Sequence, residues 1–383
     1  MPFNVFQYTL QLKNYYKTPI RPLATFLYIT NKCNLKCNFC EMGNAKQPFN
    51  NDIALKDVKD ILLQLKNWGV KELYITGGEP FVRKDIWDIL DYCNLIGMTV
   101  THITTNGTLL STLKEGELEI LKESTACLQI SIDSTLANVH DKGRGSVGTL
   151  EMITKFLKEV DRGKLPKIHL STFITKENYV EIPALIQFAS DHEADHINFL
   201  PVNFYSNFPD LKVKDGKKNY LFDSDVGLED LILKVDQGLK LSKVLKQSCN
   251  LQVLRLWVKQ YFRYAFTQER FFNHVMEYFV CSKPFNYIHV NYYGNLLPCS
   301  MLSEETNILG KDIKSAWGAM AIKYKELLLN NKYFPPCRSC YCDFPTNLRN
   351  SLIYHPLANL RLNLRLCGYY LKRKFSENSR INN

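Results

Sequence analysis

Three cysteines lie close together near the N-terminus, in the segment Asn31-Lys-Cys33-Asn-Leu-Lys-Cys37-Asn-Phe-Cys40. Their spacing lets three thiolates converge from one loop onto one metal centre. Thiolates hold iron–sulfur clusters, and a [4Fe–4S] cubane normally takes four, so a cubane with three cysteines keeps one iron free. The alternative, a structural zinc loop, needs a fourth ligand close by. No cysteine or histidine occurs between residues 41 and 92, which disfavours zinc.

Four short motifs follow the cysteines, at places where successive apolar segments end. They are Gly77-Gly78-Glu79-Pro80, Thr105-Asn106-Gly107, Ser131-Ile132-Asp133 and Arg144-Gly145. A glycine pair allows the backbone to approach a ligand where a Cβ atom would clash. A Gly-Gly turn alone is weak evidence for a ligand-binding loop. Its place in an ordered series of motifs after the cysteines makes the whole pattern specific.

The cysteine spacing and the ordered motifs resemble the radical S-adenosylmethionine (SAM) superfamily, whose signature is CxxxCxxC after the first strand of a barrel. The resemblance implies that Cys33, Cys37 and Cys40 hold a [4Fe–4S] cluster whose free iron chelates SAM. It further implies that one electron cleaves the sulfonium C–S bond and gives a 5′-deoxyadenosyl radical, which abstracts hydrogen from a substrate. An external donor such as flavodoxin or ferredoxin would supply that electron.

The same resemblance implies a set of SAM-binding residues. Phe39 is expected to lie against adenine, the turn at 77–80 to engage the amino group, and Ser131 and Arg144 to bind the carboxylate. The full expected set is Phe39, Gly77, Gly78, Glu79, Pro80, Asn106, Ser131, Asp133 and Arg144. Asp133, His169 and Asn198 could point into a barrel, but the sequence assigns no general acid or base, so the catalytic residues stay unknown.

A second group of cysteines lies in the C-terminal part. Cys281, Gly294 and Cys299 resemble the opening hairpin of the SPASM extension, with Tyr292-Tyr293-Gly294-Asn295 at the turn. Cys337, Cys340 and Cys342 follow, and the shortened set resembles the single-cluster "twitch" variant. The expected ligands of an auxiliary [4Fe–4S] cluster are Cys281 and Cys299 with two of the last three, Cys337 and Cys340 being favoured. A zinc site is the alternative. Cys93, Cys127, Cys249 and Cys367 are expected to be buried thiols.

Alternating apolar segments predict the elements that position these motifs. Strands are predicted at 25–30, 72–76, 100–104, 127–132, 168–174 and 197–200, and helices at 54–68, 85–96, 118–123, 147–160, 182–192 and 228–245. Six βα units give a parallel sheet covered by helices, either open or barrel-like. The resemblance selects the barrel: an α/β fold with a partial (β/α)6 TIM-type barrel and a smaller C-terminal lobe. The predicted domains are an N-terminal extension at 1–19, a radical SAM core at 20–205, a SPASM/twitch-like domain at 206–348 and a basic tail at 349–383.

Composition narrows the class of protein. The chain has 383 residues, 45% hydrophobic and 22% charged, and a formal net charge of +10 that favours anionic partners. Its 12 cysteines are too few for a small disulfide scaffold, where cysteine exceeds about 8% of the residues. The sequence shows no secretory signal and no spanning segment. It therefore predicts a reducing cytoplasm.

The charge is concentrated at the C-terminus. Residues 345–383 contain seven basic side chains and one acidic side chain, beside an apolar pattern at 360–371. Such a tail can pack on the barrel or lie peripherally on an anionic membrane surface. Only 24 residues precede the first predicted strand, too few for a fused leader-recognition module, so a peptide substrate would need a separate recognition protein or an intrinsic binding surface. The resemblance to single-cluster enzymes, with five cysteines in place of the seven of the full SPASM pattern, favours a small polar or anionic metabolite as substrate. The alternatives are a peptide substrate, or a non-catalytic iron–sulfur or zinc protein that binds nucleic acid, which would leave the SAM motifs unused.

Overall fold

The computed structural model describes residues 21–40, 52–201, 226–255, 258, 283–300, 302 and 306–329. The predicted N-terminal extension and basic tail lie outside these residues. So do four of the predicted auxiliary-cluster ligands (Cys281, Cys337, Cys340 and Cys342) and one predicted buried thiol, Cys367.

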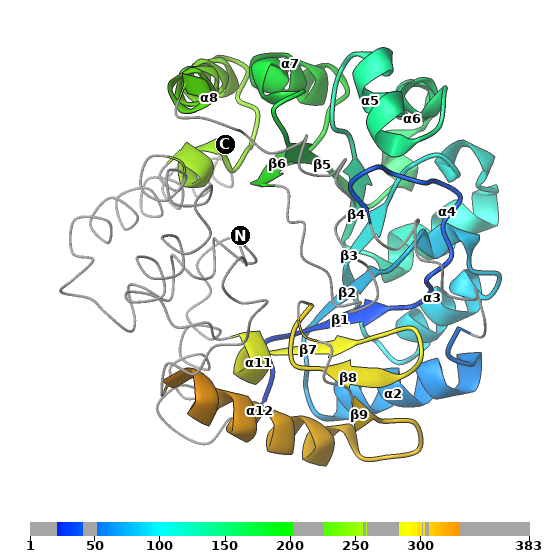
Figure 1. Ribbon diagram of the computed structural model, residues 1–383. Coiled ribbons are helices and arrows are strands. Elements are labelled where there is room, and N and C mark those ends of the chain that lie inside the picture. The colour runs from blue at the N-terminus through cyan, green and yellow to red at the C-terminus, as the bar shows by residue number, and fades with distance from the viewer. Residues whose placement is uncertain are drawn as a thin grey trace, which may run out of the picture.

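A curved parallel sheet is the centre of the fold (Figure 1). Its first six strands are β1 (Ala24–Tyr28), β2 (Glu72–Thr76), β3 (Val100–Thr105), β4 (Cys127–Ser131), β5 (Lys167–Ile174) and β6 (His196–Pro201). Each pairs in parallel with the next, from β1 to β6. The six predicted strands and the partial barrel are therefore confirmed.

Helices cover the convex face of this sheet (Figure 1). They are α2 (Leu55–Asn67), α3 (Ile86–Leu95), α4 (Glu115–Ser124), α5 (Ala137–Arg144), α6 (Thr149–Glu159), α7 (Ile182–Asp191) and α8 (Val226–Val244). Short 3-10 turns lie between them: η2 (Pro80–Val82), η3 (Leu110–Thr112), η4 (Arg162–Lys164) and η5 (Tyr179–Glu181). The pattern of apolar residues in the sequence predicted all of these α-helices except α5. That helix is short and buries the polar residues His140, Asp141 and Arg144 in place of an apolar stripe.

The sheet continues past β1 with strands from the C-terminal part of the chain. It has the order β6-β5-β4-β3-β2-β1-β7-β8-β9. After the short helix α11 (Lys283–Asn286), strand β7 (Tyr287–Val290) pairs in parallel with β1. Strands β8 (Asn295–Leu297) and β9 (Thr306–Asn307) follow as antiparallel neighbours. The predicted hairpin turn before Asn295 is present, but the sequence did not predict that β7 extends the barrel sheet.

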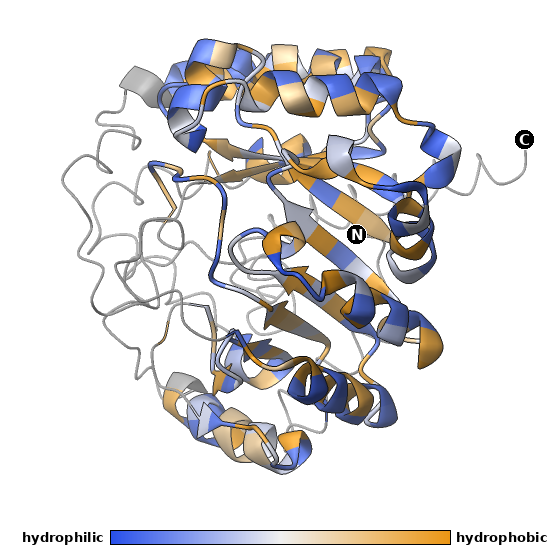
Figure 2. Ribbon diagram, turned by 90° about the vertical axis from the view of Figure 1, so that its right-hand side faces the viewer, coloured by the Kyte–Doolittle hydropathy of each residue, from blue (hydrophilic) through white to orange (hydrophobic). Residues whose placement is uncertain are grey.

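The core fills the layer between the sheet and the outer helices. Leu27, Ile75, Ile103 and Ile130 are fully buried there, and Figure 2 shows the apolar positions along the strands and helices. Helix α12 (Ile313–Leu329) extends this layer, because Trp317 is buried against Trp68, directly after α2, and its indole N–H donates to the Tyr287 carbonyl at 3.0 Å. Alternate strand residues point to the concave face, away from the helices. No helix within the described ranges has the length and apolar character to cross a membrane.

Candidate functional site

The loop at residues 31–40, called the cysteine loop below, follows β1 at the carboxyl end of the strand. The turn after β2 holds it on one side. There the Gly78 N–H donates to the Thr30 carbonyl and the Glu79 N–H donates to the Lys32 carbonyl, both at 2.8 Å. Carboxyl ends of barrel strands are where such folds place their active sites. The loop thus lies at the edge expected for chemistry.

The two glycines of this turn are explained by contact with the chain itself. A Cβ atom on Gly77 would lie 2.4 Å from the Thr30 carbonyl oxygen, and one on Gly78 would lie 2.0 Å from the Lys32 carbonyl oxygen. From the sequence, the approach of a ligand was the expected reason for these glycines. The structure shows a different steric reason: they let the turn pack against the cysteine loop.

The end of helix α5 holds the opposite side of the cysteine loop. The Asn38 backbone N–H donates to the Gly143 carbonyl at 2.9 Å, and its side chain donates to the Lys142 carbonyl at 2.7 Å. Gly145 ends α5 with a φ of 67°, and a Cβ atom there would lie 2.4 Å from the Lys36 carbonyl oxygen. The cysteine loop is therefore clamped between two segments that are far apart in sequence.

Glu79 joins the ends of two strands. Its carboxylate is fully buried and accepts hydrogen bonds from the backbone N–H groups of Phe81 (3.2 Å) and Asn106 (2.7 Å) and from the Thr105 hydroxyl (2.8 Å). Burial raises the pKa of this carboxyl to about 7, although the hydrogen bonds act in the opposite direction. These contacts give Glu79 a positioning role, because they fix the end of β3 against the turn after β2.

Asn106 places polar groups beside the first cysteine. Its side-chain amide donates to the Asn34 side chain at 2.8 Å and lies 3.8 Å from the Cys33 sulfur. The amide oxygen accepts from the backbone N–H and the hydroxyl of Thr108, at 3.0 and 2.7 Å. Asn34 and Thr108 are site residues that the sequence did not reveal, since no motif marks them and only folding brings β3 to the cysteine loop.

Arg144, Asp133 and Phe39 form a second group beside Cys37. Arg144 and Asp133 are almost fully buried and form an ion pair at 2.6 Å. The guanidinium also lies 5.4 Å from the centre of the Phe39 ring, within cation–π range. Asp133 accepts from the Phe173 N–H at 3.0 Å. A buried charge pair of this kind is costly to desolvate, and such groups cluster at functional sites.

The three thiols of the cysteine loop influence one another. Burial raises the pKa of Cys37 to about 12, the Arg144 charge lowers it, and the thiols of Cys40 and Cys33 raise it further. The pKa of Cys33 is also raised by burial. Three sulfurs close enough to repel as thiolates need a compensating positive charge, which a metal centre supplies. The residues present therefore fit an iron–sulfur cluster held by three cysteines.

The remaining predicted residues are distributed as follows. Pro80 is buried at the first position of η2, and Ser131 ends β4 opposite Ser171. Cys299 is buried after β8, while the other predicted auxiliary ligands lie outside the described residues, so that cluster stays a prediction. Cys93 and Cys127 are buried as expected, and Cys249 is only partly buried.

Comparison with known proteins gives a family for the region just described. Residues 27–189 match the model of the Radical SAM superfamily. The chain is 26% identical over 219 residues to "Fe-coproporphyrin III synthase" of Methanosarcina barkeri, covering 57% of this chain and 51% of that protein. It is 27% identical over 188 residues to "PqqA peptide cyclase" of Bradyrhizobium diazoefficiens, covering 48% and 47%. The chain thus spans about half the length of the curated relatives it matches.

Solved structures show the same fold. The structure of Streptococcus suis SuiB bound to S-adenosylmethionine aligns with a TM-score of 0.60 at 20% identity, over 85% of this chain and 72% of SuiB. The same protein has been solved with the precursor peptide SuiA, and that structure aligns with a TM-score of 0.59. At this identity the likeness establishes the partial-barrel architecture.

Proposed function

We propose that the chain, whose residues 27–189 match the Radical SAM superfamily, cleaves SAM reductively at a [4Fe–4S] cluster held by Cys33, Cys37 and Cys40. When bound, the cluster and SAM would supply a 5′-deoxyadenosyl radical that abstracts hydrogen from the substrate. The observation that carries the proposal is the convergence of the cysteine loop, the turn after β2 and the end of α5 on one edge of the barrel.

The residues around the cysteine loop would divide the work of holding SAM. Arg144 offers a buried guanidinium for a carboxylate, and Asp133 orients it. The ring of Phe39, which lies over Arg144 and 5.8 Å from the Phe173 ring, offers an apolar face for a planar base. Gly77, Gly78 and Glu79 hold the loop in place, so we assign them to positioning, together with Pro80 and Asn106.

We further propose a peptide as the substrate. A peptide was the alternative substrate expected from the sequence, and the similarity to PqqA peptide cyclase supports it over a small metabolite. In a peptide-modifying enzyme, an auxiliary cluster that includes Cys299 would accept the second electron from the substrate radical. The similarity to Fe-coproporphyrin III synthase keeps a small anionic molecule as the second candidate.

Anaerobic reconstitution with iron, sulfide, dithionite and SAM tests the radical chemistry. We expect 5′-deoxyadenosine from the wild-type chain and none from Cys33→Ala. The matched control is Cys93→Ala, because Cys93 is buried in α3 and takes no part in the site. Cluster-loaded wild-type protein that forms no 5′-deoxyadenosine would contradict the proposal.

The substrate class is tested in the same assay with a low-molecular-mass extract of the source cells. A peptide substrate in the extract should stimulate 5′-deoxyadenosine formation, and prior digestion of the extract with a non-specific protease should remove that stimulation. Stimulation that survives digestion would favour the small anionic metabolite.

A further inference from the structure

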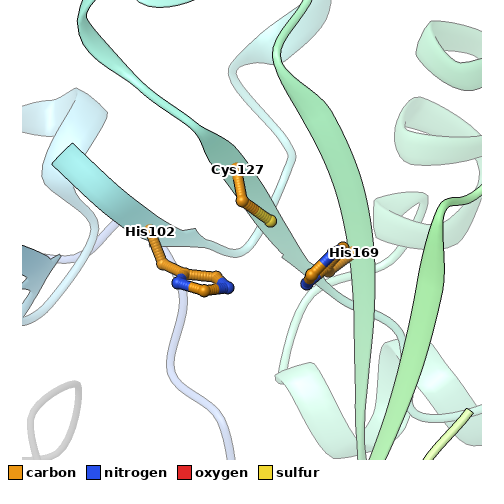
Figure 3. A group of neighbouring side chains, drawn as sticks. All are labelled: His102, Cys127 and His169. Carbon is orange, nitrogen blue, oxygen red and sulfur yellow. The ribbon is translucent and has the colours of Figure 1, made fainter. Parts of the chain in front are cut away.

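Three metal-ligating side chains meet on the concave face of the barrel, apart from the cysteine loop. They are His102 of β3, Cys127 of β4 and His169 of β5, and one ligand atom of each lies within 4.8 Å of the others. Figure 3 shows the three side chains directed toward one common space from three strands. The proposed SAM chemistry uses none of them.

The strands fix these side chains in place. Tyr74 of β2 pairs with His102 in register, and the two rings stack at 5.2 Å with an angle of 7° between them. The His102 and His169 rings are 5.4 Å apart and tilted by 57°, so their edges can face a shared point. Groups carried by sheet strands are held more rigidly than groups on loops. The cluster is therefore built into the barrel wall.

The donor atoms have the chemical character that a metal ion requires. Imidazole nitrogens and thiolate sulfurs are ligands that transition metals prefer, and the Nδ1 atom of His102 is buried with no hydrogen-bond partner within the described part of the chain. The Cys127 sulfur is buried and accepts a hydrogen bond from the His169 backbone N–H. Stacking on Tyr74 accounts for the position of the His102 ring. It gives the buried Nδ1 atom of that ring no hydrogen-bond partner among the described residues.

We propose that His102, Cys127 and His169 form a binding site for a divalent transition-metal ion of the zinc type. Two imidazoles and one thiolate suit zinc, and do not suit magnesium or calcium. Zinc bonds of about 2.0 to 2.3 Å would bring the ligand atoms roughly 3.3 to 3.6 Å apart, closer than the 4.8 Å limit within which they lie in the structure. On binding, the ion displaces the thiol proton to solvent, with no change of oxidation state.

Three protein ligands leave one position of a four-coordinate ion open. His196 is the next histidine along the row, 5.3 Å from His169, but its nitrogens are hydrogen-bonded to Ser248 (2.8 Å) and Asn198 (3.1 Å). Of the residues that the structure describes, no fourth histidine, cysteine or carboxylate joins the cluster. Three protein ligands and an open position are typical of zinc sites that bind water or a substrate group.

Zinc binding to the full-length chain with its iron–sulfur clusters already loaded tests this proposal, because the cluster cysteines are then occupied. Competition with a chromophoric chelator and elemental analysis should give one zinc per chain, and Mg²⁺ should not compete. Zinc should also raise the melting temperature of the wild-type protein, since an ion that binds only the folded state stabilises it. Wild-type protein that takes up no zinc beyond its clusters would overturn the site.

Variants locate the ion. Cys127→Ser and His102→Phe, which keeps the stacking on Tyr74, should each weaken zinc binding by at least about tenfold, since even outer-shell changes cost that much. The control Cys93→Ser removes a buried thiol of α3 and should bind zinc as the wild type does. Equal affinity in Cys127→Ser and the wild type would refute the assignment.

X-ray absorption at the zinc edge of the wild-type protein identifies the ligand atoms of the bound zinc even if a variant fails to fold. One sulfur and two nitrogen ligands are expected. A shell of three or four sulfurs would place zinc at the cluster cysteines and overturn the proposal. Formation of 5′-deoxyadenosine, measured on the same samples, reports separately on the radical chemistry.

Discussion

Single residues of the site carry roles that their types alone do not reveal. Glu79 looks like a ligand for the amino group of SAM in the sequence, yet its carboxylate accepts three hydrogen bonds from its own chain. Arg144 and Asp133 form a buried pair. At this scale, burial and partners decide which polar groups remain available for a ligand and which ones hold the architecture together.

Glu79 gives a prediction about pH. Its pKa in the folded chain, about 7, is above the ordinary value of 4.5, so the folded state binds this proton more tightly than the unfolded state. The stabilising contribution is therefore complete below about pH 4.5 and is lost as pH rises through about 7. Between pH 5 and 8, the free energy of unfolding of the wild type should fall relative to that of Glu79→Gln by up to about 3 kcal/mol.

Urea unfolding at several pH values checks this, with Glu119→Gln as an exposed control on α4 that should track the wild type. Parallel pH curves for the wild type and Glu79→Gln would show that the buried carboxyl does not titrate as described.

Short elements position the cysteine loop through close backbone contacts. The turn after β2 and the end of α5 reach it from opposite sides, and in each a glycine stands where a Cβ atom would overlap a carbonyl oxygen of the loop. Because backbone atoms cannot yield as a flexible side chain does, the geometry of the three cysteines depends on these contacts.

Gly78→Ala should therefore displace the cysteine loop. Its Cβ atom would lie 2.0 Å from the Lys32 carbonyl oxygen, and overpacking of this kind costs about 1 to 3 kcal/mol. We expect less iron and sulfide per chain after reconstitution, with the far-ultraviolet circular dichroism unchanged. Gly116→Ala on α4 is the matched control, because no atom lies within 4 Å of the position its new methyl group would take and alanine favours the helix by up to about 1 kcal/mol. Full cluster content in Gly78→Ala would contradict the steric argument.

At the scale of the whole molecule, the C-terminal part of the chain completes the barrel sheet. Strand β7 lies beside β1, and His289 of β7 stacks on Phe26 at 4.8 Å with an angle of 7° between the rings. Helix α12 packs outside, with Trp317 against Trp68. A single hydrophobic core thus joins residues from both ends of the described chain, so we expect the two parts to unfold together.

His289 lies in this joint core and gives a prediction about pH. It is fully buried, burial lowers its pKa well below 6.5, and neither ring nitrogen has a hydrogen-bond partner within the described ranges. The folded state therefore favours the neutral ring, and the corresponding stability is present above about pH 6.5 and is lost as pH falls. His289→Phe keeps the stacking and removes an unsatisfied polar group, so it should stabilise the protein by about 1 to 3 kcal/mol and more so near pH 5.

Thermal unfolding between pH 5 and 8 measures both effects, and His192→Gln, at the partly exposed position directly after α7, serves as the control. An acid slope in His289→Phe as steep as that of the wild type would contradict the assignment of buried, neutral His289.

The local features of the fold could be read from the amino-acid sequence alone. Apolar alternation placed six strands and all of the barrel helices except α5, and the spacing of Cys33, Cys37 and Cys40 with the ordered strand-end motifs indicated the family. These signals can be read directly because helix and strand periods and loop spacing act between near neighbours in the chain.

The contacts between residues that are distant in the sequence became visible only in the folded chain. It set β7 beside β1 and tied Asn34 and Thr108 to Asn106. It also brought His102, Cys127 and His169, one from each of three strands, within 4.8 Å. From the sequence, Cys127 was expected to be a buried thiol and His169 only a residue that could point into the barrel. The physical reason is the register of a parallel sheet, which aligns positions on neighbouring strands after long connections and leaves no fixed spacing in the sequence.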